Sequence, residues 1–298
     1  MLVHVDVLQY EKRVVIFPQQ KADFGWIVTL RGRLWMGGNG WSMSTSPSLT
    51  VLKAFKVLDL FRSHRQVGVS QCAELLGLTK ANAHRLLVSL AAAGAVERMD
   101  SGQYRLSIWM FEVGAQVPLL RALTEHAQVP MERLVADTGL QAHLAVRDGT
   151  ELIYLLKISR VEGRVRTRPG TRNALYATGL GKALLAGAPE SVIEEVIAQG
   201  LRPLTKHTKT SPALLRAELA DVLRTGFAYD REERQIGVSC VATALRDRTG
   251  RVIAAISVPS DSETWAGGPS RLHQPLRRTA QAIEARINRY PGDLVRPY

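Results

Sequence analysis

Cysteine is scarce in this sequence. The 298 residues include only Cys72 and Cys240, which lie in segments of very different character. This argues against a disulfide framework and against a cysteine-rich metal site. The seven histidines also lack the close spacing of a zinc site, so we expect no metal and no other cofactor.

Long hydrophobic runs are missing as well. The longest, such as VIAAISV at residues 252–258, are far shorter than the roughly 20 residues that a membrane-spanning helix needs. The first residues lack the charged region, apolar stretch and cleavage site of a secretory signal. We therefore expect a cytoplasmic protein with no membrane partner.

Positive charge is abundant. The 39 Lys and Arg residues exceed the 27 Asp and Glu residues and give a formal net charge of +12. Such an excess favours nucleic-acid binding, because bound Lys and Arg release counterions from phosphates. The excess is +2 over residues 1–48, +4 over residues 49–107 and +6 over residues 108–298. Charge alone therefore does not identify the DNA-binding part.

Residues 1–48 show no sustained hydrophobic periodicity and end in a Gly- and Ser-rich stretch, WMGGNGWSMSTSPS. We expect a poorly ordered N-terminal extension. Met43 directly precedes the first periodic segment, so a translation start at this residue and a genuine extension both remain open.

Residues 49–107 have the pattern of a winged helix-turn-helix. A first helix is predicted by apolar residues at three- and four-residue spacing. Ser70 and Thr79 are suited to cap two further helices, which Gly77 and Gly94 would close. Two short segments, AVERMD and QYRLS, on either side of a Ser-Gly turn then predict the two strands of a wing.

The third predicted helix has one apolar face, and its opposite face is free to enter a major groove. The alternative is a small three-helix bundle that binds protein or has no partner, in which Arg85 is only a surface ion-pair partner and His84 is half-buried. The candidate DNA-binding residues are Lys80, Ala81, Asn82, His84, Arg85 and Ser89 of this helix and Arg105 of the wing.

The rest of the chain predicts a linker and an α+β domain. Residues 108–126 keep helical apolar spacing, although Pro118 should kink this linker helix or start a new one. In residues 127–298, hairpin turns at Asp148-Gly149 and Thr249-Gly250 alternate with helical segments. Antiparallel hairpins separated by helices indicate a sensor-like α+β domain rather than a doubly wound nucleotide fold.

The stretch LYATGLGKALL, residues 175–185, is not a phosphate-binding P-loop. That loop requires G-x-x-x-x-G-K-[ST], whereas Tyr176 lies five residues before Gly181, where the first glycine should be, and Ala183 follows Lys182. A Gly-rich turn at the start of a helix still suits one small anion, such as a carboxylate. The alternative is that the glycines only allow the helix to pack closely on the sheet.

Three segments together resemble the isocitrate lyase regulator (IclR) family of bacterial transcription factors. They are LTKANAHRLLVSLAAAGAVER, LYATGLGKALLA and GFAYDREERQIGVSCVATALRDRTGRVIAAISV, and the resemblance covers about residues 49–290. It implies a winged helix-turn-helix, a linker helix and a GAF-like effector domain in a homodimer or homotetramer. The residues that match the family signature are Glu233, Gly237, Val238 and Cys240.

The sequence departs from the family pattern at three places. Tyr176 stands where histidine is frequent, Thr243-Ala244 replaces a common Ala-Pro pair, and Pro259 replaces a second serine. These departures put the transfer of any particular ligand in doubt. The resemblance implies an effector pocket formed by Thr178, Gly179, Leu180, Gly181, Asp230, Cys240 and Ser257.

Asp230 beside a carboxylate would be a contact between like charges. We therefore expect an effector that carries a hydroxyl or a ring besides its carboxylate: a sugar acid, a keto acid hydrate or an aromatic acid. The predicted function is a transcriptional regulator whose affinity for operator DNA responds to a small organic acid and which controls a catabolic operon. Repression is the expected mode, with activation left open as the alternative.

A catalytic C-terminal domain is the alternative function. Cys240 would then act as nucleophile with Asp230 and one of His143, His207 or His273. Because apolar residues flank Cys240, we expect a buried and inert thiol, and so no enzyme.

Overall fold

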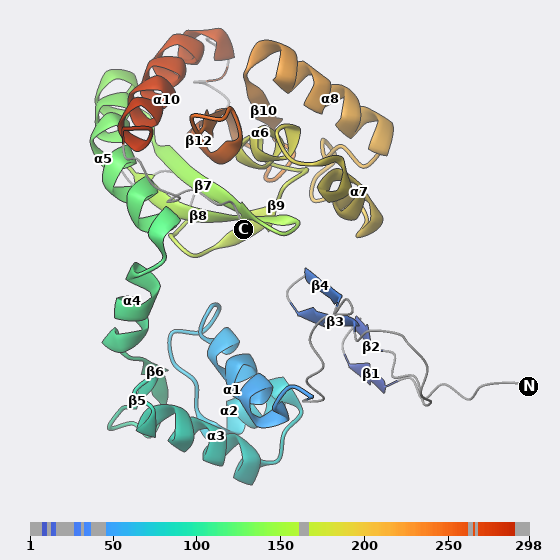
Figure 1. The fold of residues 1–298 in the computed structure, drawn as a ribbon, viewed down its shortest axis with the longest axis vertical. Coiled ribbons are helices and arrows are strands. Elements are labelled where there is room, and N and C mark those ends of the chain that lie inside the picture. The colour runs from blue at the N-terminus through green and yellow to red at the C-terminus, as the bar shows by residue number, and fades with distance from the viewer. Residues whose placement is uncertain are drawn as a thin grey trace, which may run out of the picture. The chain divides into compact units, whose positions relative to one another are not determined.

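The computed structural model describes residues 8–10, 13–15, 27–30, 33–36, 46–160, 167–261, 265 and 268–289 (Figure 1). In the N-terminal segment, β1 (Leu8–Tyr10) pairs with β2 (Arg13–Val15), and β3 (Ile27–Leu30) pairs with β4 (Arg33–Met36). The expectation of poor order over residues 1–48 otherwise concerns residues that lie outside this description.

The next five elements form the predicted winged helix-turn-helix. A buried cluster that includes Val57, Cys72, Leu87 and Tyr104 joins its helices to its two-stranded wing. The elements are α1 (Leu49–Leu60), α2 (Val69–Leu76), α3 (Lys80–Ala92), β5 (Val96–Arg98) and β6 (Tyr104–Leu106).

The helix ends confirm two of the predicted caps and correct a third. The Thr79 hydroxyl accepts a hydrogen bond from the Asn82 N–H at 3.3 Å, and Gly77 closes α2 with a φ of 61°. Ser70 does not cap α2, because the helix begins one residue earlier, at Val69. The reason is non-local: Val67 forms a β-bridge with Tyr104 of the wing, which leaves Gly68 as the last extended residue before the helix.

The predicted linker consists of parts of two helices. α4 (Ile108–Ala115) ends before Pro118, which starts α5 (Pro118–Thr138). Proline suits this first helical position because its missing N–H would have no helical partner there. Leu119 and Leu123 are buried in the core of the C-terminal part, so residues 118–126 are the first turns of a packed helix.

The C-terminal part is built on one antiparallel sheet with the strand order β10-β11-β12-β7-β8-β9. Its strands are β7 (Ala142–Asp148), β8 (Glu151–Ile158), β9 (Arg172–Ala174), β10 (Ala228–Arg231), β11 (Ser239–Arg246) and β12 (Val252–Ser260). Its further helices are α6 (Gly179–Ala186), α7 (Glu190–Ala198), α8 (Pro212–Thr225), the short η1 (Pro269–Leu272) and α10 (His273–Ile287).

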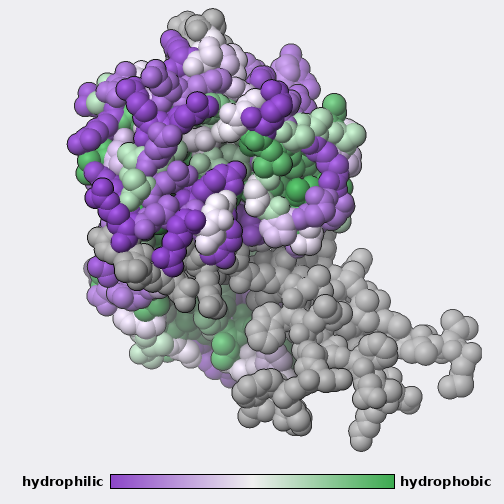
Figure 2. Space-filling model, turned by 45° about the horizontal axis from the view of Figure 1, so that its top comes forward, coloured by the Kyte–Doolittle hydropathy of each residue, from purple (hydrophilic) through white to green (hydrophobic). Residues whose placement is uncertain are grey.

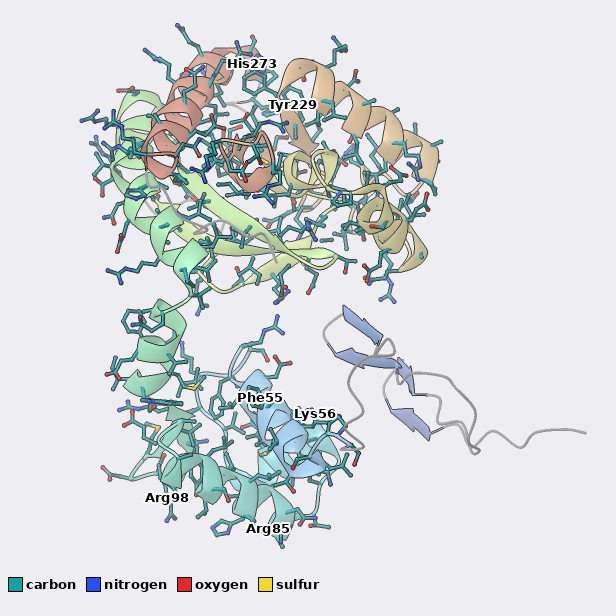
Figure 3. The ribbon with its side chains drawn as sticks, viewed as in Figure 1. Phe55, Lys56, Arg85, Arg98, Tyr229 and His273 are labelled. Carbon is teal, nitrogen blue, oxygen red and sulfur yellow. The ribbon has the colours of Figure 1, made fainter. Side chains whose placement is uncertain are left out.

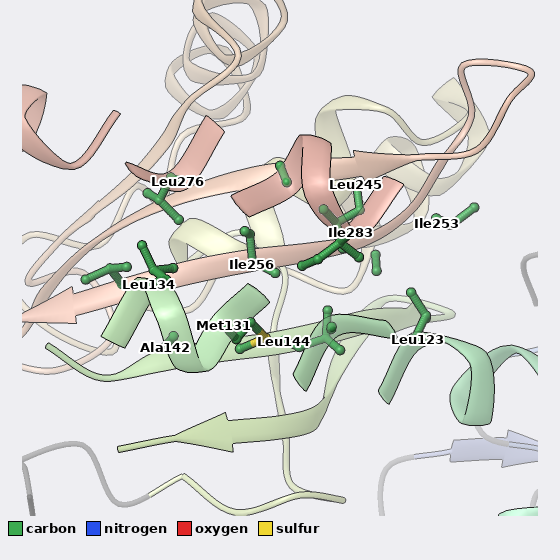
Figure 4. Packing of buried hydrophobic residues seen from close by; sticks show 14 of the residues in the cluster. Leu123, Met131, Leu134, Ala142, Leu144, Leu245, Ile253, Ile256, Leu276 and Ile283 are labelled. Carbon is green, nitrogen blue, oxygen red and sulfur yellow. The ribbon is translucent and has the colours of Figure 1, made fainter. Parts of the chain in front are cut away.

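Alternate residues of the central strands point to opposite faces of this sheet, as strand geometry requires. Large residues such as Leu144, Leu245 and Ile256 pack against α5 and α10 (Figure 4). On the other face small residues, Ala242 and Ala255 among them, lie against α6. The predicted α+β class is confirmed, and the small residues let α6 approach the sheet closely.

The surface of the protein is mostly hydrophilic, as expected when the hydrophobic residues are buried in the cores. On the face that Figure 2 presents, hydrophilic residues cover most of the coloured surface and hydrophobic residues form smaller areas. Within the described residues, none of the helices is long and apolar enough to cross a membrane.

Candidate functional site

The outer face of α3 is the first candidate site. Four residues of this helix, Ala83, Leu86, Leu87 and Leu90, are buried against α1 and α2. Six of the predicted DNA-binding residues lie on the remaining surface, and all but the half-buried Asn82 are exposed: Lys80, Ala81, Asn82, His84, Arg85 and Ser89.

Arg85 projects from α3 away from the core of the domain (Figure 3). Its Nη2 donates to the Asn82 side-chain oxygen at 3.2 Å, one helical turn earlier. This bond fixes the direction of the guanidinium without neutralising its charge. Arg85 therefore remains available to a phosphate or to a base edge.

The wing carries one predicted arginine and one that the sequence reasoning missed. Arg105 on β6 donates to the Glu97 carboxylate at 2.5 Å, so a phosphate would have to compete with that partner. Arg98 on β5 is exposed and has no ion-pair partner among the described residues (Figure 3). Its place at the end of β5, three residues before the Ser101-Gly102 turn of the wing, is the sequence signal that identifies it.

The second candidate site is a cavity of about 500 Å³ between the sheet and the start of α6. Five of the seven residues predicted for an effector pocket line it: Thr178, Leu180, Asp230, Cys240 and Ser257. The further lining residues are His143, Tyr154, Thr167, Thr171, Arg172, Asn173, Arg234, Gln235, Val238 and Pro259. Their contact with an effector stays a prediction.

Gly179 and Gly181 are not part of the cavity wall, and their role is in packing. A Cβ atom on Gly179 would lie 2.7 Å from the sulfur of Cys240. A Cβ on Gly181 would lie 2.2 Å from the carbonyl oxygen of Leu175. These glycines therefore let α6 approach its neighbours, which was the alternative to an anion site.

The start of α6 also offers fewer free donors than its sequence suggests. Thr178, the N-cap, accepts the Gly181 N–H at 3.0 Å through its hydroxyl. The Gly179 N–H is directed to the sulfur of Cys240. An anion at this turn would have to rely largely on the N–H of Leu180 and on the helix dipole.

Lys182, the lysine of the Gly-Lys pair, is buried and does not line the cavity. Its Nζ lies 2.7 Å from Glu233 Oε1 and 2.5 Å from Glu218 Oε2. Only partners far away in the sequence reveal this role, so the local motif could not have predicted it. The ion pairs tie α6 to α8 and to the loop that follows β10.

That loop positions Asp230, the last buried residue of β10. Asp230 Oδ1 accepts backbone hydrogen bonds from Glu233 at 2.8 Å and from Arg234 at 3.4 Å. Burial, and next to it the negative charge of Glu233, raise the pKa of the Asp230 carboxyl to about 7. Among the described residues, Oδ2 has no hydrogen-bond partner.

His143 and Tyr154 give the cavity neutral polar groups. Burial, aided by Lys157, lowers the pKa of His143 to about 3, and its Nε2 lies 2.9 Å from the Thr167 hydroxyl. Burial raises the pKa of Tyr154 to about 12. Both side chains are therefore uncharged at neutral pH, and both can hydrogen-bond a polar ligand.

The cavity does bring Cys240, Asp230 and His143 together, which the catalytic alternative requires. Burial, however, raises the pKa of the Cys240 thiol far above its ordinary value, and the nearby Asp230 adds to the effect. A nucleophilic cysteine needs the opposite shift. His143 is in turn a weak base. These pKa shifts therefore favour a role for Cys240 in the wall of a binding cavity over a role as nucleophile.

No group of three or more His, Cys, Asp or Glu side chains in the described part of the chain is arranged to hold a metal ion. The polar groups of the cavity are instead hydroxyls, neutral rings, two amides, one thiol, one carboxyl and two guanidinium groups. Such a lining suits a small polar organic molecule.

Comparisons with known proteins match the two domains that carry these candidate sites. The model of the IclR helix-turn-helix domain matches residues 50–100, and that of the bacterial transcriptional regulator IclR C-terminal domain matches residues 120–285. The DNA-binding transcriptional repressor YiaJ of Escherichia coli K12 is 35% identical over 222 residues, 72% of this chain and 79% of that protein.

The transcriptional regulator KdgR of Dickeya chrysanthemi is 31% identical over 212 residues, which are 70% of each chain. Among solved structures, an IclR homologue from Microbacterium hydrocarbonoxydans in complex with 4-hydroxybenzoate is 26% identical. It superposes with a TM-score of 0.76 over 81% of this chain and 100% of that one. The chain therefore belongs to the IclR family of DNA-binding transcriptional regulators, with a helix-turn-helix domain and a C-terminal ligand-binding domain.

Proposed function

We propose that the protein is a cytoplasmic repressor of a catabolic operon whose affinity for operator DNA changes when a small organic acid occupies the cavity. The single observation that carries this proposal is the cavity itself, where Thr178, Asp230, Cys240 and Ser257 converge from α6 and three strands. The relative that binds 4-hydroxybenzoate supports an organic acid, and YiaJ, named a repressor, supports repression.

The DNA-binding surface in this proposal is the outer face of α3, with the wing beside it. Lys80 at the helix start would contact a phosphate, whereas Arg85 lies where a recognition helix reaches phosphates or base edges. Selection of binding sites from genomic DNA identifies the operator, and with it the regulated genes.

The proposal includes a homodimer or homotetramer, because one winged helix makes too few contacts for a long operator. Ile108 and Phe111 of α4 support it, since they are 72% and 71% exposed although both are large and apolar. Leu119 and Leu123, which continue the apolar spacing of the linker, are buried within the chain. The candidate interface is thus confined to α4.

The proposed function is tested in two steps. Isothermal titration calorimetry with carboxylic acids of the three expected classes first identifies those that bind the protein. The operator-binding assay is then repeated with each of them. Acids that bind and also change operator affinity support the proposal, and a wild-type protein that binds no carboxylate contradicts it.

A further inference from the structure

The cavity contains two arginines, and only one of them is already neutralised by the described residues. Arg172 is 13% exposed and is paired with the carboxylates of Asp148 and Glu151. Arg234 is exposed and forms no salt bridge with any of the described carboxylates. A ligand carboxylate would therefore compete with existing partners at Arg172 but not at Arg234.

Asn173 holds Arg234 in place. Its side-chain oxygen accepts the Arg234 Nε–H at 2.8 Å, and its Nδ2 donates to the Tyr154 hydroxyl oxygen at 3.2 Å. Both terminal nitrogens of the guanidinium and the hydroxyl proton of Tyr154 are left without a hydrogen-bond partner in the described part of the chain. These donors can form a bidentate contact and one further bond with a carboxylate.

The deep end of the cavity has the opposite electrostatic preference to the rim at Arg234. Asp230 is only 4% exposed, whereas Arg234 lies at the solvent-accessible rim. When it is ionised, the Asp230 carboxylate repels a ligand carboxylate, but it accepts a hydrogen bond from a ligand hydroxyl. The deep end of the cavity therefore favours a donor group and the rim favours an anion.

On the basis of the proposed function, we infer that Arg234 determines the specificity of the cavity by binding the carboxylate of the effector at the rim, with the donor end of the effector directed to Asp230. The effector class is then a monocarboxylic acid with a hydroxyl at its far end. This places the carboxylate away from the start of α6, where few backbone donors are free.

The test compares acids with their neutral amides. Calorimetry measures the dissociation constants of 4-hydroxybenzoate, 4-hydroxybenzamide, gluconate and gluconamide for the wild type, Arg234→Gln and Arg234→Lys. Arg224→Gln is the matched control, because this arginine is exposed on α8 and pairs there with Asp221 of the same helix. Thermal melts establish that each variant is folded.

We expect Arg234→Gln to weaken the binding of an acid about tenfold or more, as loss of a charged hydrogen-bond partner does. Amide binding should change less than twofold, and Arg234→Lys should recover part of the acid affinity. Acid binding within twofold of wild type in folded Arg234→Gln overturns the role of Arg234 but leaves the proposed function standing. A wild type that binds neither acid nor any other carboxylate overturns both.

Discussion

At the scale of single residues, the protonation of Asp230 is the most testable property of the cavity. Its carboxyl has a pKa of about 7 in the folded chain, against an ordinary value of 3.8. Between about pH 4 and pH 7, therefore, this carboxyl is protonated in the folded state and ionised in the unfolded state. This contribution to stability is complete below pH 4 and is lost as the pH rises through 7.

We expect Asp230→Asn to remove that pH dependence, because the amide cannot ionise while its oxygen can still accept the two backbone bonds. Relative to this variant, the wild type should lose up to about 4 kcal/mol of unfolding free energy between pH 4 and pH 8. Urea unfolding of both proteins at several pH values measures the difference. Parallel curves for the two proteins would show that Asp230 titrates normally.

At the scale of secondary-structure elements, the close approach of α6 to Leu175 makes Gly181 a packing residue. Gly181→Ala should lower the free energy of unfolding by about 1–3 kcal/mol or more, because the new Cβ would lie 2.2 Å from the Leu175 oxygen. Gly114→Ala in α4 is the control, since a Cβ at that position would have no described atom within 4 Å and alanine favours a helix.

Chemical denaturation of the two glycine variants provides the comparison. The control should be neutral or slightly more stable than wild type. Equal stability of Gly181→Ala and wild type would mean that α6 does not pack as described, and would reopen the anion site at its start.

The outer face of α3 yields a prediction about DNA. If Arg85 contacts a base edge, Arg85→Ala should cost about 1–3 kcal/mol on the selected operator and relax its sequence preference. Lys80→Ala should weaken binding to all sequences alike and lower the salt slope by about one, because a phosphate contact carries no sequence information. Fluorescence anisotropy at several salt concentrations separates the two effects.

Arg224→Ala, far from α3 in the sequence and on the exposed side of α8, serves as the control for charge alone. Wild-type affinity in both Arg85→Ala and Lys80→Ala, measured at matched salt, would refute the assignment of α3 as the recognition helix.

At the scale of the whole molecule, the exposed apolar side chains of α4 predict assembly. The protein should be at least a dimer at micromolar concentration, and Phe111→Asp should shift it toward monomer, because a charge buried in an interface is costly. Light scattering measures the mass of both proteins. A wild type that is only monomeric and binds DNA one to one would contradict the prediction.

The sequence predicted those features of the whole molecule that depend on local patterns. Helical spacing indicated α1 and α3, and glycine and Asp-Gly signals indicated the end of α2 and the β7-β8 hairpin. Features set by distant contacts escaped it. The start of α2 depends on the bridge between Val67 and Tyr104, and the role of Lys182 depends on Glu218 and Glu233.

The residues of the candidate effector cavity also fall into those that the sequence could identify and those that only the fold brings together. Asp230, Cys240 and Ser257 could be named beforehand because the family resemblance includes their segments. Arg234 lies in one of the same segments, but the resemblance gives it no role in the pocket. Its place at the cavity depends on the folded loop after β10 and on Asn173, 61 residues away in the sequence. Sequence reasoning thus named five of the fifteen residues that line the cavity, but not the arginine at its rim.

The central claim is that the cavity and the operator are coupled, and the operator affinity with and without a saturating carboxylic acid tests it most directly. Coupling between two sites typically changes affinity by about 5- to 150-fold. We predict a change of at least about fivefold in the wild type and none in Ser257→Phe, whose ring would occupy part of the cavity and obstruct the acid. An unchanged operator affinity in the wild type, with the acid shown to be bound, would contradict the account.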